Sequence, residues 1–155
     1  MSAKQEVTIN AARIPSIRDI VIQTRPKQML KNGLVLVPLF FTVNIWYNSS
    51  DLSGMSSIIT RALAALGIFI LISAAVYFIN DLADAKKDRI HPRKRSRPIA
   101  AKRISVPWAV GIATLMIIGG LSSAYLISVP LLITITSYLS INIAYSWWIK
   151  NIIIL

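Results

Sequence analysis

The sequence predicts an all-α integral membrane protein with four transmembrane helices. The chain has 155 residues, of which 55% are hydrophobic and only 15% are charged, against roughly 25% charged residues in an average soluble domain. The 46 residues 104–149 carry no formal charge, and only Asp51 and Arg61 interrupt residues 32–79. A water-soluble fold of this size cannot bury so much apolar chain. The absence of cysteine also excludes a disulfide scaffold and a thiolate metal site.

Four apolar segments approach the roughly 20 residues that a helix needs to cross a bilayer. They are residues 32–48, 58–79, 108–127 and 129–148. The first is the weakest, because its apolar core is short and contains Pro38 and Asn44. Pro130 lies just after the third segment, so a tight uncharged hairpin is expected between the third and fourth helices.

The distribution of the cations predicts the orientation. The sequence has 17 Lys and Arg against 6 Asp and Glu, a net charge of +11. The tail up to Lys31 holds six of these cations, the loop 80–107 holds nine, and the regions around Asp51 and Ser128 hold none. Because cytoplasmic loops retain positive charge, both termini and the loop 80–107 are expected on the cytoplasmic side of the inner cell membrane.

Two regions follow from this pattern: a basic cytoplasmic tail over residues 1–31 and a transmembrane domain over residues 32–155. In the tail, Ile14, Ile17 and Val21 alternate with arginines in a way that suits a short interfacial helix. A loosely ordered basic tail explains the same composition.

Three of the six acidic residues, Asp81, Asp84 and Asp88, follow directly on an apolar segment. At helical spacing they share one face. Three like charges on one face repel one another unless a multivalent cation lies in front of them, and carboxylates are the hard oxygen ligands that Mg²⁺ prefers. The pattern favours a Mg²⁺ site at the end of a membrane helix. The alternative is a solvated helix end where the acids offset nearby lysines.

A basic loop, residues 91–98, comes next with the sequence His-Pro-Arg-Lys-Arg-Ser-Arg-Pro. Topology alone requires a basic cytoplasmic loop, and such a loop also attracts anionic lipid. Its position beside the acidic face suits a diphosphate, with metal on one side and Arg and Lys on the other. Nucleic acid is not an expected partner, because the loop lies against the bilayer and lacks interleaved aromatic residues.

Four motifs together resemble the UbiA-type intramembrane prenyltransferase superfamily. The first is Asn80-Asp81-x-x-Asp84-x-x-x-Asp88, followed by the basic loop. The others are Arg25-Pro-Lys-Gln-Met-Leu-Lys-Asn32 and Tyr145-Ser-Trp-Trp-Ile-Lys150. The basic loop is similar to that of the branch whose members transfer a phosphoribosyl group to decaprenyl phosphate.

This resemblance implies a Mg²⁺-dependent transferase that moves a 5-phosphoribosyl group from phosphoribosyl diphosphate to a polyprenyl phosphate lipid. It implies that Asp81, Asp84 and Asp88 are the catalytic residues that hold the metal. The resemblance also implies which residues contact the substrate phosphates: Lys27, Asn32, Asn80, Arg89, Arg93, Lys94, Tyr145 and Lys150. For Tyr145 and Lys150, an aromatic interface anchor and a topological cation are equally good interpretations.

One departure leaves the enzymatic status open. Members of the superfamily are about twice as long and carry a second aspartate motif, so this chain resembles the N-terminal half of a UbiA-type helical bundle. An oligomer or a partner that supplies the other half would complete the site. The alternatives are a prenyltransferase that takes a prenyl diphosphate and an aromatic or quinone acceptor, and a non-catalytic truncated membrane module.

Overall fold

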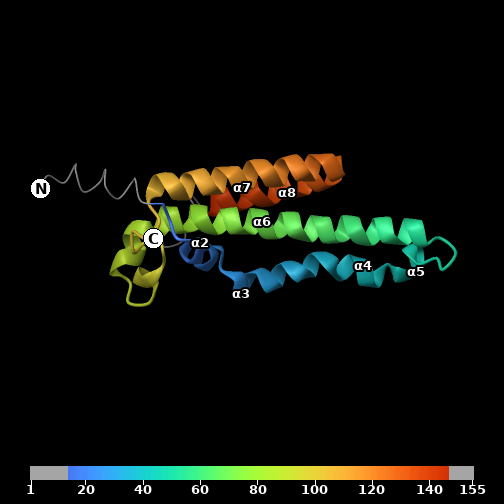
Figure 1. Cartoon of the computed structure of the whole chain (residues 1–155), viewed down its shortest axis with the longest axis horizontal. Helices are drawn as coiled ribbons and strands as arrows, with labels where there is room; N and C mark the ends of the chain where they lie inside the picture. Colours follow the sequence, from blue (N-terminus) through green and yellow to red (C-terminus); the bar gives the residue numbers. More distant parts are fainter. Residues whose placement is uncertain (1–13, 147–155) are drawn as a thin grey trace, which may run out of the picture.

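The computed structural model describes residues 14–146, and this range is helical without any β-strand. One long helix, α6 (Leu52–Ile90), runs the length of the molecule. Helices α7 (Val106–Ile127) and α8 (Val129–Ala144) form a hairpin along one flank of α6 (Figure 1). The helical segments that precede α6 lie along its other flank (Figure 1). The all-helical fold class predicted from the sequence is confirmed for the described residues.

Helix α6 extends well beyond the predicted segment 58–79 at both ends. Its 39 residues span about 58 Å at 1.5 Å per residue, nearly twice the hydrocarbon core of a bilayer. At its start, the Asp51 side chain accepts a hydrogen bond from the Gly54 backbone N–H. At its end, Lys87 and Arg89 lie in the last turn, where cations offset the helix dipole. The helix stops at His91, whose extended backbone suits the Pro92 that follows.

The cap at Asp51 gives the start of α6 a pH dependence. The Gly54 backbone hydrogen bond, and after it the Ser53 hydroxyl, lower the pKa of this exposed carboxyl. When folding lowers the pKa of a carboxyl, the ionised carboxyl stabilises the folded helix end at every pH above its ordinary pKa. This stabilisation is lost as the pH falls through the lowered pKa. We therefore expect the Gly54 amide to keep its hydrogen-exchange protection at pH 6 and to lose it progressively as the pH falls below the ordinary pKa of an Asp carboxyl, after correction for intrinsic exchange rates. Asp51→Asn, which caps without titrating, should keep its protection over the same range. Wild-type protection that stays constant as the pH falls far below the ordinary pKa of Asp contradicts this prediction.

The predicted hairpin between the third and fourth segments is confirmed. A single residue, Ser128, separates α7 from α8, and its hydroxyl accepts a hydrogen bond from the Leu131 backbone N–H at 3.3 Å. Pro130 lies in the first turn of α8, where a missing N–H costs no intrahelical bond. Helix α8 has 16 described residues. Trp147, Trp148 and Lys150 of the predicted fourth segment lie outside the described residues.

The first predicted segment differs from a single helix over residues 32–48. It is divided into the 3₁₀ helix η1 (Leu30–Leu36) and the short helices α4 (Val37–Phe41) and α5 (Val43–Trp46). Pro38 has no N–H to continue the ladder from η1. The Thr42 hydroxyl donates to the Pro38 carbonyl at 2.7 Å, and the Trp46 indole donates to the Leu39 carbonyl at 2.8 Å. Side chains thus satisfy carbonyls at these breaks.

Within the described part of the predicted tail, from residue 14 on, two helices precede η1: α2 (Ile17–Thr24) and α3 (Pro26–Met29). Helix α2 packs against α6. Its Gln23 is buried, whereas Ile17 and Val21 are exposed. Asp19 of α2 also pairs with Arg103 at 2.8 Å, which fastens the helix to the loop before α7. Whether the exposed apolar side lies in a membrane interface stays a prediction.

Two apolar clusters hold the helices together. One joins α6 to the α7–α8 hairpin around Ile72, Ala124 and Ile135. The other lies near the end of α6, where Phe78 packs with Ile99 and Ile104 of the following loop and with α7. The second cluster therefore anchors the basic loop beside the acidic residues.

Helices α6 and α7 are both long and apolar enough to cross a membrane. This agrees with the predicted membrane protein. Four crossings and cytoplasmic termini stay predictions.

Candidate active site

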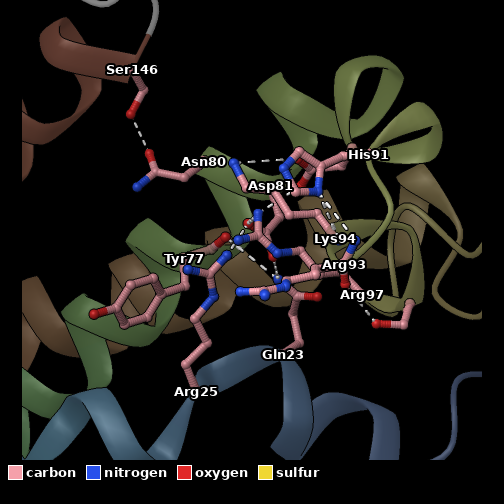
Figure 2. Close-up of polar contacts among 12 residues, drawn as sticks. Gln23, Arg25, Tyr77, Asn80, Asp81, His91, Arg93, Lys94, Arg97 and Ser146 are labelled. Carbon is pink, nitrogen blue, oxygen red and sulfur yellow. Dashed lines mark hydrogen bonds and ion pairs between the residues drawn. The ribbon is translucent and has the colours of Figure 1, made fainter.

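A polar pocket of about 150 Å³ lies near the C-terminal end of α6. Three parts of the chain surround it: the α2–α3 junction, the last turns of α6 with the basic loop, and the end of α8 (Figure 2). Its lining residues are polar or charged: Arg25, Asn80, Asp81, Asp84, Lys94, Arg97, Tyr145 and Ser146. The pocket thus combines carboxylates and cations at the end of an apolar helix.

Asp81 is a buried carboxylate that accepts several hydrogen bonds in the pocket. Although its side chain is only 3% exposed, it accepts hydrogen bonds from Gln23 at 2.7 Å, from Arg97 at 3.1 Å and from Arg25. A buried carboxylate needs such partners, because an uncompensated charge in a low-dielectric interior is very costly. Asp81 therefore ties α2 and the basic loop to α6.

Arg97 joins two carboxylates that lie two helical turns apart. Its Nη1 is 3.1 Å from Asp81 Oδ1 and 2.6 Å from Asp88 Oδ2. Asp88 is buried as well, and Lys94 Nζ lies 4.0 Å from its other oxygen. A single guanidinium nitrogen thus lies between Asp81 and Asp88, where like charges would otherwise repel.

Arg25 reaches the pocket from an unusual backbone conformation. Its φ of 54° lies in the left-handed region, which costs a residue with a side chain roughly 1–2 kcal/mol. Pro26 follows immediately and begins α3. The guanidinium pairs with Asp81 and lies 5.0 Å from the centre of the Tyr77 ring, a cation–π contact. Backbone strain of this kind concentrates at functional sites, and here it points the Arg25 side chain at the carboxylate.

The end of α8 closes the pocket on a third side. The Ser146 hydroxyl donates to the Asn80 amide oxygen (Figure 2). Tyr145, half-exposed, lines the same pocket. The motif at the end of the fourth segment thus lies next to the acidic motif, although 65 residues separate Tyr145 from Asn80 in the sequence.

The structure brings five of the predicted site residues together in the pocket wall and a sixth, Asp88, next to it. The five are Asn80, Asp81, Asp84, Lys94 and Tyr145.

The other predicted phosphate ligands lie elsewhere or outside the described residues. Lys27 and Arg93 are exposed and do not line the pocket. Arg89 donates to the Ala100 carbonyl at 3.4 Å. Asn32 accepts a hydrogen bond from Ser73 at 3.3 Å, further along α6. Lys150 falls outside the described residues.

Three pocket residues were not among the predicted ligands: Arg25, Arg97 and Ser146. Gln23, which donates a hydrogen bond to Asp81, was not predicted either. Arg25 begins one of the resembling motifs and Arg97 is the last cation of the basic loop, so both were visible as charges in a motif. Gln23 carries no sequence signal, because only the packing of α2 on α6 brings it to Asp81.

The donor set fits Mg²⁺ when substrate phosphates complete the coordination. No group of three or more His, Asp or Glu side chains converges as a metal site within residues 14–146. Asp81 and Asp84 nonetheless line one pocket together with the Asn80 amide. Mg²⁺ is commonly held by one or two carboxylates plus substrate phosphates rather than by an all-protein cage. The pocket matches that kind of site.

Comparison with known proteins places the chain in a family. The model of the UbiA prenyltransferase family matches residues 35–155, which is most of the chain. The chain belongs to the UbiA prenyltransferase family. Enzymes of this family are generally Mg²⁺-dependent, and the matched region includes every acidic residue of the pocket.

Individual relatives share about a third of their aligned residues with this chain. It is 31% identical to decaprenyl-phosphate phosphoribosyltransferase of Mycolicibacterium smegmatis over 87% of this chain and 41% of that protein. It is 35% identical to the protein of that name from Corynebacterium glutamicum over 82% and 37%. Nodulation protein NoeC of Azorhizobium caulinodans is 31% identical over 78% and 36%. The chain spans about two fifths of the length of these relatives.

Proposed function

We propose that this chain takes part in Mg²⁺-dependent transfer of a 5-phosphoribosyl group from phosphoribosyl diphosphate to a polyprenyl phosphate, such as decaprenyl phosphate. The observation that carries the proposal is the pocket in which Asp81 and Asp84 face Arg25, Lys94 and Arg97. The names of the relatives from M. smegmatis and C. glutamicum support this substrate pair.

The reaction breaks the bond between C1 of the ribose and the diphosphate oxygen. A bond forms between C1 and an oxygen of the lipid phosphate, and diphosphate leaves. A bound Mg²⁺ ion supplies electrostatic stabilisation of the negative charge on the leaving group. No covalent nucleophile from the protein is needed, since fixed charges placed where charge develops lower the barrier.

The side chains of the pocket have separate roles in this proposal. Asp81 and Asp84 hold the metal, with Asp88 next to them. Arg97 and Lys94 bind oxygens of the diphosphate, as guanidinium and ammonium groups do in most phosphate sites. Arg25 binds from the opposite wall, and Asn80 and Tyr145 orient the donor through neutral hydrogen bonds.

The site is placed in this proposal on the cytoplasmic side of the inner cell membrane, where a water-soluble donor is available. The lipid acceptor then approaches along the apolar flank of α6 and α7, with its phosphate at the membrane surface. This orientation follows from the positive charge of the tail and of the loop 80–107.

The proposal is tested by incubating the purified chain in nanodiscs with labelled phosphoribosyl diphosphate, decaprenyl phosphate and Mg²⁺. We expect label to appear in the lipid extract, in a product sensitive to mild acid. Lipid product that forms only when a partner chain is added would assign this chain to a composite enzyme. Binding of donor without any product under both conditions would overturn the transfer reaction in favour of a non-catalytic membrane module.

The choice of donor is tested by competition. We expect inorganic diphosphate and phosphoribosyl diphosphate to displace one another. Prenyl diphosphates should compete no better than inorganic diphosphate, because the polar and charged lining binds the diphosphate group but offers no apolar wall for the prenyl chain. Strong competition by a prenyl diphosphate, together with prenylation of an aromatic acceptor, would support the quinone-type reaction instead.

A further inference from the structure

The contacts of Arg97 indicate how metal binding and diphosphate binding influence each other. Arg97 Nη1 lies 3.1 Å from Asp81 and 2.6 Å from Asp88. Mg²⁺ binds oxygen ligands at about 2.0–2.1 Å. A divalent cation that takes Asp81 Oδ1 therefore competes for that oxygen with Arg97, and also with Arg25, whose guanidinium contacts the same atom.

The charge balance around the pocket favours binding of the metal together with the diphosphate. Among the residues that line the pocket or pair with its lining, three carboxylates face three cations: Asp81, Asp84 and Asp88 against Arg25, Lys94 and Arg97. A divalent cation alone would leave an excess of two positive charges in a partly buried site, where such an excess is costly. A diphosphate bound with the metal offsets that excess and offers new partners to the released guanidinium.

We infer that Arg97 couples metal and diphosphate binding: it occupies the carboxylates of Asp81 and Asp88, yields to the metal, and turns to the diphosphate. This deepens the proposed function, on whose diphosphate donor site it rests. Arg25 contacts the same Asp81 oxygen but does not share the coupling role, because it does not contact Asp88 and is also held over the Tyr77 ring. Arg97 comes from a loop between α6 and α7, so its side chain can turn without moving a helix.

The inference makes opposite predictions for the two ligands when Arg97 is removed. In Arg97→Ala, Mn²⁺ alone should bind at least about threefold more tightly than in the wild type, because the one cation that contacts both Asp81 and Asp88 is gone. Labelled inorganic diphosphate in the presence of Mg²⁺ should bind at least about tenfold more weakly, since a charge-assisted hydrogen bond is lost. If Arg97 only supported the fold, its removal would weaken the binding of Mn²⁺ and of diphosphate alike.

The experiment uses the full chain in nanodiscs, with the electron paramagnetic resonance signal of free Mn²⁺ as the first readout and filtration binding of ³²P-diphosphate as the second. Arg95→Ala is the matched control, because Arg95 belongs to the same loop but is exposed and does not line the pocket. Arg97→Lys keeps the charge but loses the planar fork, so we expect the same two directions with smaller size. Should Arg97→Ala fail to fold, Arg97→Lys carries the test.

Weaker Mn²⁺ binding in the Arg97 variants, or unchanged diphosphate binding, would overturn the inference. Both readouts are binding constants and need no turnover. A chain that shows the opposite shifts but makes no lipid product therefore contradicts the proposed reaction and leaves the coupling by Arg97 intact. A chain that makes lipid product without these shifts contradicts the coupling by Arg97 and leaves the proposed reaction intact.

Discussion

Replacing Asp84 with asparagine is expected to lower phosphoribosyl transfer at least about a hundredfold while the chain stays folded. Asp84 lines the pocket next to Asp81 and is only partly buried. A neutral amide is a poor ligand for Mg²⁺ and does not offset the charge of the neighbouring cations. Asp84 is a sharper test than Asp81, because the buried Asp81 also links α2 and the basic loop to α6.

The measurement is the initial rate of label transfer into lipid at saturating Mg²⁺, with thermal unfolding as the check on folding. Asp51→Asn is the matched control, since it makes the same chemical change at the opposite end of α6. We expect this control to retain full activity. An Asp84→Asn chain with more than a third of the wild-type rate would remove Asp84 from the proposed metal site.

Replacing Phe78 with alanine is expected to cause the largest loss of stability. Phe78 is 0% exposed and packs with Ile99, Ile104 and Ala109. Deleting a buried phenyl ring from a packed core costs roughly 3–5 kcal/mol through lost contacts and the cavity left behind. Since the same cluster anchors the loop that carries Arg97, diphosphate binding should weaken as well.

Unfolding of Phe78→Ala in mixed micelles by steric trapping measures this loss directly. Phe40→Ala provides the comparison, because Phe40 is 72% exposed on α4 and should cost little. A difference between the two variants below about 1 kcal/mol would contradict the role assigned to the Phe78 cluster.

Much of the fold was predictable because long apolar runs and prolines are local signals. Residues 58–79 and 108–127 fall within α6 and α7, and Ser128 with Pro130 marks the hairpin. The division of the first segment was less predictable. Pro38 was visible as a weak point, but no local signal marks the 3₁₀ geometry of η1, which packs against α6.

The acidic side of the candidate site was also predictable, because the spacing of Asp81, Asp84 and Asp88 is a property of one helix. The cationic side was predictable only in part. Charge alone could not rank the nine cations of residues 80–107: Lys94 was predicted and lines the pocket, Arg97 lines it without having been predicted, and Arg93 was predicted but does not line it. Gln23 and Arg25 lie 58 and 56 residues before Asp81 in the sequence. A helical repeat cannot predict contacts over such a separation.

The central claim is that the end of α6 forms a joint site for a divalent cation and a diphosphate. Equilibrium binding of labelled phosphoribosyl diphosphate to the wild-type chain in nanodiscs, with Mg²⁺ and then with excess EDTA, tests it most directly. The account predicts saturable binding that requires Mg²⁺ and that disappears in Asp84→Asn. Binding of equal strength in EDTA, or binding that survives the loss of the carboxylate, would contradict it.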